Sequence, residues 1–333
     1  MKAFILDRYG RGKALRFGDL PQPDLRDTDV LVEIHAASVN PIDYKIRSGD
    51  FKLVLPFKLP VALGSDLAGV VVKVGVKVKS FKPGDEVFAQ TGTSAIGTFA
   101  EFSAVAETDL ALKPKTLSME EAASVPLVAL TAWQVLFDRA NVKKDDKVFI
   151  QAGSGGVGVF AIQLAKYAGA TVATTAGATS AELVRRLGAD VVIDYRREDF
   201  AMLLSGYDVV LNSQDAASLE KSIGILKPGG RVISISGPPD PAFAKLIGAS
   251  WFVRQVMRLL SAKARRQAKR QGVDYSFLFM QANGAQLAKI ASLIEAGNLR
   301  TVVDRVFPFA ETNEALAYVE TGRAKGKVVV KIK

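Results

Sequence analysis

Three glycines in the segment 151–158 have the spacing of a turn that binds a dinucleotide. Gly153, Gly155 and Gly158 follow a short apolar run at 147–150 and precede a run of good helix formers. In such a turn the first glycine permits a tight bend, the second lets the backbone approach a pyrophosphate, and the third lets the helix pack on the strand. The N–H groups at the start of the helix then face the anion. The pattern predicts a phosphate-binding cradle made of Gly153, Ser154, Gly155, Gly156, Val157 and Gly158.

The alternation of strand-like and helical patterns continues after the glycines. A second apolar run covers 170–175, and a helical pattern follows at 180–187. Further strand-like runs lie at 190–195, 207–212 and 230–235. Strands that alternate with helices at this spacing form a doubly wound parallel sheet. We therefore expect an α/β fold whose Rossmann domain carries the cradle, since the strand–turn–helix context that the glycine pattern needs is present.

The end of the second strand indicates which dinucleotide binds. NAD sites usually carry Asp or Glu about 20 residues after the glycines, where it bonds the ribose 2′-hydroxyl. The stretch 173–180 has no acidic residue, and its small hydroxyl side chains, which include Thr175 and Ser180, leave room for a 2′-phosphate. Four arginines in the following segments could supply positive charge: Arg185, Arg186, Arg196 and Arg197. This pattern favours NADP(H), although Thr and Ser here would also suit the capping of a helix.

The first 120 residues have the texture of a separate β-type domain. Strand-like runs at 30–36, 68–75 and 86–89 are separated by turn signals such as 82–85,. Short strands of this kind predict an irregular β-barrel.

A helical stretch connects this region to the Rossmann domain. Ser118 and Glu121 form a capping-box pattern, and helical character extends through Asp138,. After residue 280 we expect one helix and two strands, at 281–296, 302–307 and 326–332. The final strands are expected to return to the first domain.

Composition excludes several kinds of chemistry. The 333 residues include no cysteine and a single histidine, His35. Disulfides, thiolate nucleophiles and metal sites built from cysteine or several histidines are therefore excluded. His35 lies within a strand-like run and is expected to be structural. Because no run of 18 apolar residues exists and the first residues lack a signal-peptide core, we expect a cytoplasmic protein without a membrane span.

The positive charge of the chain is concentrated in one segment. Residues 251–271 carry seven Lys and Arg and no acid, out of a net charge of +10. Apolar residues repeat there at helical spacing: Phe252, Val256, Leu259 and Leu260. The segment predicts a basic amphipathic helix whose apolar side packs on its own domain or on a dimer mate. The alternative is peripheral contact with an anionic membrane. No nucleic acid is expected, since no motif directs these charges toward bases.

Several segments together resemble the medium-chain dehydrogenase/reductase superfamily, in its zinc-independent quinone oxidoreductase and alkenal/enone reductase branch. The segments are 37–43, 64–71, 82–87, 152–158, 226–230 and 326–329. The resemblance implies a GroES-like β-barrel catalytic domain at 1–122 and 281–333. It implies a Rossmann NADP-binding domain at 123–280, with the active site between the two.

The resemblance also indicates whether zinc takes part in the reaction. Relatives that use zinc carry Cys, His and Cys ligands, and these positions fall here near Asn40, Ser65 and Leu127. We therefore expect hydride transfer without zinc, from NADPH to an acceptor that is already electron-poor, such as a quinone or an α,β-unsaturated carbonyl. Such acceptors need positioning and hydrogen-bond polarisation more than a metal.

The resemblance assigns expected roles to individual residues. Asn40 would contact the nicotinamide end and Thr131 would lie under it, in the substrate cleft. Tyr195 would pack near the 2′-phosphate. Four more cofactor contacts are implied along the Rossmann domain, at Asn212, Ser236, Gly237 and Phe279. Lys327 would contribute a cofactor contact from the C-terminal strand. For Asn40 and Lys327 the alternatives are a residue that orders the turn before Pro41 and a solvated charge at a strand end.

Two positions depart from the family pattern. The lysine that relatives use for the 2′-phosphate would fall at Thr179 or Ser180, so other groups must bind that phosphate. Enoyl reductases of this branch use a tyrosine as the acid, and this position resembles Phe51, which cannot donate a proton. We expect Phe51 to line the substrate cleft, and Tyr44 or water to supply the proton.

The sequence also leaves two alternative functions, and it predicts an oligomeric state. The alternatives to a quinone or enone reductase are an enoyl-thioester reductase, which Phe51 disfavours, and a non-catalytic NADPH-binding redox sensor. The segment 275–279 is expected to be the last strand of the Rossmann sheet, with an exposed apolar edge. Relatives pair this edge across a two-fold axis, so we expect a homodimer.

Overall fold

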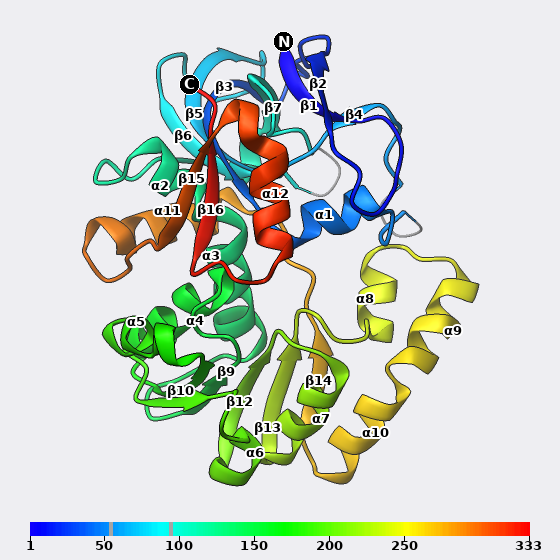
Figure 1. The fold of residues 1–333 in the computed structure, drawn as a ribbon, viewed down its shortest axis with the longest axis vertical. Coiled ribbons are helices and arrows are strands. Elements are labelled where there is room, and N and C mark those ends of the chain that lie inside the picture. The colour runs from blue at the N-terminus through cyan, green and yellow to red at the C-terminus, as the bar shows by residue number, and fades with distance from the viewer. Residues whose placement is uncertain (53–55, 93–95) are drawn as a thin grey trace. The chain divides into compact units, whose positions relative to one another are not determined.

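The chain divides into two compact units. The computed structural model describes residues 1–52, 56–92 and 96–333. Unit 1 comprises Met1–Leu130 and Gln281–Lys333, and unit 2 comprises Thr131–Met280 (Figure 1). The sequence placed the first boundary at residue 122. The two units instead divide between Leu130 and Thr131, within α3 (Pro126–Trp133). A continuous helix gives the sequence no turn signal at which to divide the chain.

Unit 2 is built on a six-stranded parallel sheet with the order β11-β10-β9-β12-β13-β14. The strands are β9 (Lys147–Ile150), β10 (Thr171–Ala176), β11 (Val191–Asp194), β12 (Tyr207–Asn212), β13 (Leu226–Ser234) and β14 (Asp274–Phe277). The order reverses direction next to β9, the strand before the glycine turn. This is the doubly wound arrangement that the sequence predicted, and open sheets of this kind bind ligands where the order reverses.

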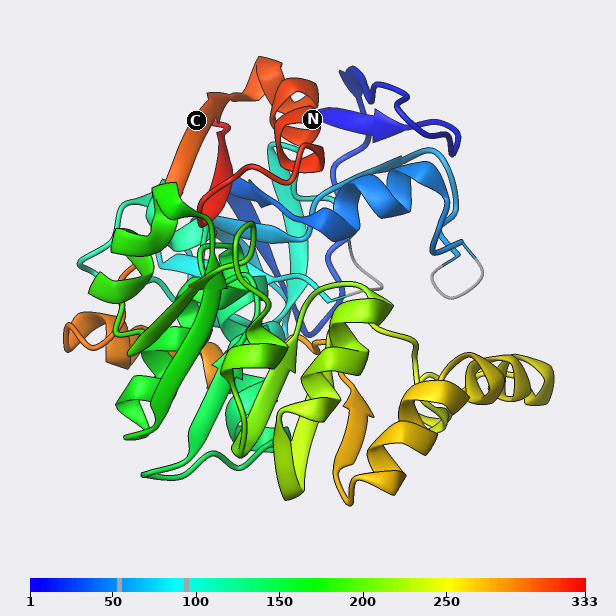
Figure 2. The same cartoon turned by 60° about the horizontal axis from the view of Figure 1, so that its bottom comes forward.

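Helices lie on both sides of this sheet (Figures 1 and 2). They are α4 (Gly156–Tyr167), α5 (Ala181–Arg186), α6 (Phe200–Leu203), α7 (Ala216–Gly224), α8 (Pro241–Leu246), α9 (Trp251–Leu260) and α10 (Ala262–Arg270). Phe149, Val210 and Val232 of the strands share one buried cluster with residues of α7 and α10. Strands covered on both faces read as continuous apolar runs, which is why the sequence located them well.

Unit 1 is mainly antiparallel. Its larger sheet has the order β15-β16-β3-β5-β6-β8, with β7 also paired to β3, and a smaller sheet has the order β2-β1-β4. The strands are β1 (Lys2–Leu6), β2 (Arg16–Asp19), β3 (Asp29–Val39), β4 (Val61–Ala62), β5 (Asp66–Val74), β6 (Glu86–Gln90), β7 (Phe102–Ala106), β8 (Leu110–Leu112), β15 (Val303–Pro308) and β16 (Lys327–Lys331). The helices within the unit are α1 (Pro41–Ser48), α2 (Met119–Ala123), α11 (Gly284–Glu295) and α12 (Thr312–Glu320). The C-terminal β16 pairs with β3, so the last segment completes the sheet begun by the first.

The helical stretch expected from Ser118 to Asp138 is interrupted. The capping box is formed, with Glu121 N donating to Ser118 Oγ over 3.1 Å and Ser118 N donating to a Glu121 carboxylate oxygen over 2.9 Å. However, α2 ends at Ala123 and α3 begins at Pro126. Proline lacks the N–H that would continue the first helix, so the chain starts a second one there.

The basic segment also differs from its prediction, because it forms two helices instead of one. α9 and α10 meet at Ser261, whose hydroxyl is buried and donates to Met257 O. Met257 and Ala264 are buried, whereas the apolar residues expected to pack, Phe252 and Leu259 among them, are exposed. The described residues include no helix that is long and apolar enough to cross a membrane.

Candidate functional site

The glycine turn of unit 2 requires its first and third glycines. A Cβ atom on Gly153 would lie 2.2 Å from Thr174 Oγ1, and one on Gly158 would lie 2.4 Å from Ala152 O. Ala152 itself has a positive φ of 50°. The turn therefore brings β9, β10 and α4 closer together than side chains would permit, as the fingerprint predicts.

The second glycine occupies open space at the start of α4. The nearest atom to a Cβ on Gly155 would be Ala152 O at 3.3 Å, and residues 154–157 are all partly exposed. Gly155 is the N-cap of α4 and supplies no capping side chain. In other helices the side chain of the N-cap residue accepts a hydrogen bond from a backbone N–H. These N-cap residues include Ser118, Asp215, Asp240, Ser250 and Asn283. Within the described residues, the N–H groups that begin α4 thus have no capping side chain as acceptor, and the exposed cradle fits a pyrophosphate,.

Thr175, predicted as a cofactor ligand, helps to hold the turn. Its buried hydroxyl accepts a hydrogen bond from Ala152 N over 2.9 Å, and its carbonyl accepts one from Gly153 N over 2.9 Å. The end of β10 therefore fixes the position of the glycine turn.

A second cluster surrounds the residue after β10. A Cβ on Gly177 would lie 3.7 Å from a ring carbon of Tyr195 and 4.0 Å from its hydroxyl, so the ring stands beside this strand end. Arg196 lies over the Tyr195 ring at 5.7 Å. Ser180 is buried at the end of the short 3₁₀ turn Ala178–Ser180. This is the place at which a 2′-phosphate would meet the chain in a nucleotide fold of this type.

The four nearby arginines are not equivalent. Arg186 and Arg197 lie 3.9 Å from carboxylate oxygens of Glu182 and Asp194. Arg185 and Arg196 form no ion pair within the described part of the chain. Because Arg196 also contacts Tyr195, it is the cation best placed to bind a 2′-phosphate at this cluster.

A neutral polar network closes the carboxyl ends of β9, β12 and β13. Asn212 is fully buried, and its Nδ2 donates to Gln151 Oε1 over 2.8 Å. Ser234 Oγ donates to Asn212 Oδ1 over 2.7 Å and accepts from Gly237 N, also over 2.7 Å. Ser236 is exposed, and its hydroxyl donates to the carbonyl of Gln214 over 2.5 Å. The network shapes the loops at this edge.

Phe279 and Thr131 complete the predicted residues of unit 2. Phe279 is half-buried against Phe243, with ring centroids 5.6 Å apart. Thr131 is buried in α3.

Unit 1 contains a second polar network, and this one is charged. Asn40 is fully buried at the start of α1, with Nδ2 donating to Asp66 Oδ2 over 2.8 Å. Lys327 Nζ donates to Asn40 Oδ1 over 2.5 Å and to Val39 O over 3.0 Å, and lies 3.6 Å from Asp66 Oδ2. Asp43 accepts a hydrogen bond from Asn40 N over 2.7 Å. The Asn40 amide is therefore fixed in one orientation by charged neighbours.

Burial controls the charges of this network. It raises the pKa of Asp43 to about 7 and raises the pKa of Asp66, while the Lys327 ammonium opposes both shifts. Burial likewise lowers the pKa of Lys327, and the nearby carboxylates oppose that shift. Two carboxyls and one ammonium share the space, so one proton bound at Asp43 would balance the charge.

The other predicted residues of unit 1 are Tyr44 and Phe51. Tyr44 is partly exposed on α1, and burial together with Glu320 raises the pKa of its hydroxyl. It therefore stays protonated at neutral pH and can donate a proton. Phe51 is half-buried against the core of unit 1, whose members include Ile46.

The residues at the zinc positions of relatives do not fit that metal. Asn40 is committed to Asp66 and Lys327, and Leu127 offers a backbone N–H, which donates to Asp66 Oδ1 over 2.9 Å. Ser65 is buried, but a neutral hydroxyl is a poor ligand by itself,. In the described part of the chain, no three Cys, His, Asp or Glu side chains gather as a metal site would require. The Lys327 ammonium would also repel a cation.

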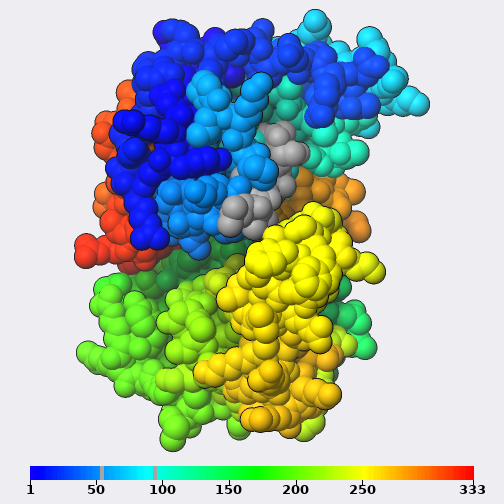
Figure 3. Space-filling model, turned by 90° about the vertical axis from the view of Figure 1, so that its right-hand side faces the viewer, coloured from blue at the N-terminus to red at the C-terminus, as the bar shows by residue number. Residues whose placement is uncertain are grey.

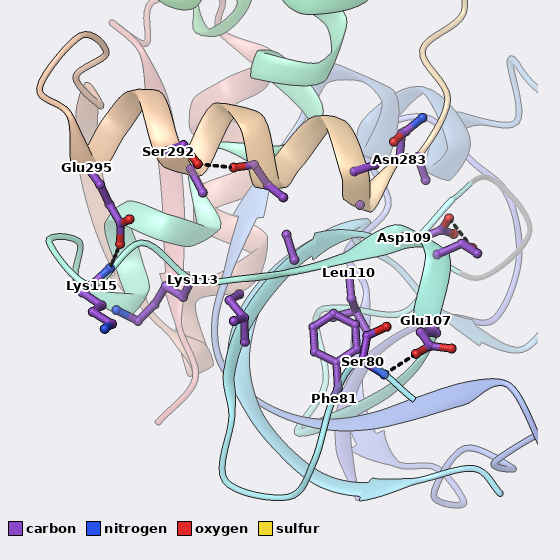
Figure 4. Close-up of a pocket in the computed structure, with 18 residues that line it drawn as sticks. Ser80, Phe81, Glu107, Asp109, Leu110, Lys113, Lys115, Asn283, Ser292 and Glu295 are labelled. Carbon is purple, nitrogen blue, oxygen red and sulfur yellow. Dashed lines mark hydrogen bonds between the residues drawn. The ribbon is translucent and has the colours of Figure 1, made fainter. Parts of the chain in front are cut away.

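A cavity of about 980 Å³ in unit 1 lies apart from these residues. It runs between α11 and β8, and none of the residues predicted from the sequence lines it (Figure 4). Its polar groups are largely paired, as when Lys115 N donates to Glu295. A Cβ on Gly284 would lie 2.1 Å from Leu110 O, so α11 meets β8 closely at one end of this groove.

The site residues expected from the sequence leave out several members of the two networks, among them Asp66, Asp43, Gln151 and Ser234. Gln151 directly precedes the glycine turn, and strand-end position was a usable signal for it. Asp66 lies in an apolar strand, where a lone carboxylate indicates a buried partner, but nothing local names that partner.

Comparison with known proteins covers nearly the whole chain. The family profile "Zinc-binding dehydrogenase" matches residues 187–330, and "Alcohol dehydrogenase GroES-like domain" matches 26–115. A mouse protein, NAD(P)H oxidoreductase RTN4IP1, mitochondrial, is 37% identical over 100% of this chain and 89% of its own. The Arabidopsis thaliana NADPH-dependent alkenal/one oxidoreductase, chloroplastic, is 36% identical over 99% of this chain and 79% of its own. Among solved structures, the quinone oxidoreductase from Coxiella burnetii has a TM-score of 0.88 and 33% identity, covering 100% of this chain and 99% of that one.

Proposed function

We propose that this chain, which belongs to the medium-chain dehydrogenase/reductase superfamily, is an NADPH-dependent reductase of quinones or α,β-unsaturated carbonyls. The observation that carries the proposal is the glycine cradle at the uncapped N-terminus of α4. The acceptor class follows the names of the relatives, which include alkenal/one and quinone oxidoreductases. Such acceptors are electron-poor, so the reaction needs a positioned hydride donor and a proton.

The cofactor and the chain would divide the chemistry between them. Bound NADPH supplies a hydride to the acceptor. Residues 153–158 would hold the pyrophosphate through backbone N–H groups, and the cluster of Tyr195, Arg196 and Ser180 would receive the 2′-phosphate. Phe279 and the loop at Ser236 and Gly237 would contact the nicotinamide end.

We assign Asn40 and Tyr44 to the acceptor side of the reaction. The Lys327 and Asp66 contacts fix the Asn40 amide, so Lys327 acts as a positioning residue for Asn40. Tyr44 keeps its proton at neutral pH and would deliver it to the reduced acceptor, in competition with water. Phe51 and Thr131 would line the substrate cleft. Asn212 would support the loops at the carboxyl ends of β9, β12 and β13, which would meet the ribose.

The cradle is tested by comparing two alanine variants in an NADPH fluorescence titration. Gly158→Ala places a Cβ 2.4 Å from a backbone oxygen, so we expect lost stability together with lost binding,. Gly155→Ala meets nothing nearer than 3.3 Å, so the protein should fold while NADPH binding weakens. Undiminished NADPH binding by Gly155→Ala would overturn the proposed cradle.

The phosphate preference is tested at Arg196. Arg196→Gln should weaken NADPH binding about tenfold and leave NADH binding unchanged, because a phosphate contact by a cation is a charge-assisted hydrogen bond. Arg197→Gln is the matched control, since Arg197 faces Asp194. Equal effects of the two substitutions would count against the assignment.

The acceptor class is tested by NADPH oxidation with quinones, enals and enoyl thioesters. Turnover of the first two supports the proposal. Preference for enoyl thioesters would favour the alternative reductase, and tight NADPH binding without turnover would favour a redox sensor.

We also propose that the enzyme works without zinc, as a homodimer in the cytoplasm. A cysteine-free chain with one histidine lacks the usual zinc ligands, so activity should survive prolonged chelation,. β14 is the edge strand of its sheet and pairs with β13 on one side. A monomer mass by light scattering would exclude pairing of two such edges, and cell fractionation tests the compartment.

A further inference from the structure

The two helices of the basic segment leave a large apolar surface uncovered. Trp251, Phe252 and Leu259 of α9 are 73%, 69% and 74% exposed. Leu260 and Leu246, at the ends of α9 and α8, are exposed as well. Large apolar side chains that gather in this way on one helix usually mark a surface that meets another apolar phase.

α9 is attached to unit 2 by a narrow side. Met257 is its buried residue, and the helix packs on its neighbours α8 and α10. In Figure 2, α9 extends away from the parallel sheet of its unit. α9 and α10 also share one face of that unit, drawn in yellow and gold in Figure 3. The apolar side of α9 is therefore presented to the surroundings next to α10.

The same two helices carry cations without counter-charges. Lys263 is paired with Glu220, and Arg265 bonds Ser261 Oγ and the carbonyl of Arg258. Five further cations have no carboxylate partner among the described residues: Arg254, Arg258, Arg266, Lys269 and Arg270. A helix with a strong apolar side and unpaired arginines at its margins has the chemistry of an interfacial helix.

We propose that α9 and α10 form a docking surface for the anionic surface of a lipid membrane. Trp251, Phe252 and Leu259 enter the boundary between headgroups and acyl chains, and the cations contact lipid phosphates. A second copy of this chain fits the surface less well. A two-fold interface would place the basic segment against itself, where like charges repel, whereas anionic lipid complements both features.

Vesicle binding tests the proposal with the intact protein. Wild type is mixed with phosphatidylcholine vesicles with and without phosphatidylglycerol, at low and high salt, and sedimented. We expect binding only to the anionic vesicles, and weaker binding at high salt. Trp251, one of two tryptophans, should shift its emission to the blue on binding, and Trp251→Phe should abolish that shift.

Two variants separate the charged and apolar contributions. The first carries Arg254→Gln, Arg258→Gln, Arg266→Gln and Arg270→Gln, and should bind roughly several hundredfold more weakly, since each cation near the surface contributes roughly fivefold. The second, Phe252→Ser with Leu259→Ser, should lose the residual binding at high salt. The matched controls lie on exposed sites of unit 1 and should bind as wild type does: Lys73→Gln with Lys79→Gln, and Val76→Ser.

Three results would overturn the proposal. They are no binding to anionic vesicles at low salt, unchanged binding by the four-arginine variant, and equal loss in the controls. A fourth would replace it: if Phe252→Ser with Leu259→Ser converts a dimer to a monomer and no vesicle binds, the surface is an interface between copies. NADPH affinity should stay at the wild-type value in every variant, which shows that the protein is folded.

Discussion

Each of the two buried polar networks of this protein holds one asparagine side chain in place, one with charged partners and the other with neutral partners. In unit 1, Asn40 is held by a carboxylate and an ammonium, and in unit 2, Asn212 is held by an amide and a hydroxyl. Both asparagines are fully buried at the ends of strands. The charged network fixes its amide more strongly, but each ion depends on its partner. The neutral network tolerates loss of one member more easily, because no charge is left unpaired.

Removal of the Lys327 ammonium from the charged network should have the largest effect on this comparison. Lys327→Met leaves Asp66 buried without its cation, so we expect unfolding to need about 3–5 kcal/mol less free energy. Urea unfolding measures the change. Lys331→Met is the control on the same strand, because its ammonium is half-exposed beside Glu120 and should contribute less than about 1 kcal/mol,.

A second substitution separates charge from packing at that site. In the Lys327→Met background, Asp66→Asn removes the unpaired carboxylate and should restore a large part of the lost stability. If Lys327→Met costs no more than Lys331→Met, or Asp66→Asn restores nothing, the network is not held by charge.

Addition of a charge to the neutral network is the reverse experiment. Asn212→Asp places a carboxyl beside Gln151 and Ser234, whose side chains are neutral. Burial raises the pKa of such a carboxyl, so stability present at low pH is lost as the pH rises through that value. We expect a loss of about 3 kcal/mol at about pH 8 and a smaller one at about pH 5. Equal losses at both pH values, measured by urea unfolding, would show that only packing was disturbed.

Asp43 gives the charged network its own pH dependence. Its pKa rises from 3.8 to about 7 on burial, so the folded state keeps a proton that the unfolded state has lost. The stability contributed by this proton is complete below about pH 4 and is lost as the pH rises to about 7. We expect wild type to lose about 3–4 kcal/mol across this range relative to Asp43→Asn. A constant difference between the two proteins would contradict the raised pKa.

The same contrast explains how much the sequence could predict. The glycine turn, the parallel strands and the position of Asn212 depend on neighbours within a few residues or on adjacent strands, and local patterns located them. The charged network joins residues far apart, since Lys327 and Asn40 are separated by 287 positions. The family resemblance indicated both residues, but not that they bind each other, because one chain carries no record of such pairs.

The basic segment shows a different limit. Amphipathic spacing predicted an apolar side correctly, but not that most of it stays uncovered, since periodicity says nothing about what a face meets,. The break at Ser261 has no glycine or proline to announce it. The buried Ser261 hydroxyl instead bonds back to Met257 O, which is a common cause of a bend in a helix,.

The smallest expected effects compare one substitution in both networks. Ser38 Oγ donates to Asp66 Oδ2 over 2.9 Å, and Ser234 Oγ donates to Asn212 Oδ1 over 2.7 Å, with both serines fully buried. Each serine→alanine change removes one donor of the same kind, so the charge of the acceptor is the main difference. Hydrogen bonds to charged groups contribute about 1.5–3 kcal/mol and neutral ones about 1 kcal/mol.

Ser38→Ala should therefore destabilise the protein more than Ser234→Ala, by about 1 kcal/mol in urea unfolding near neutral pH. Gly237 N also loses its acceptor in Ser234→Ala, but this residue is partly exposed and water can replace the hydroxyl,. Burial raises the pKa of Asp66, and as the pH falls through that raised pKa the carboxyl takes up a proton and becomes neutral, so the gap between the two variants should close,. A gap that keeps its size at low pH would mean that packing, and not the charge on Asp66, distinguishes the two networks.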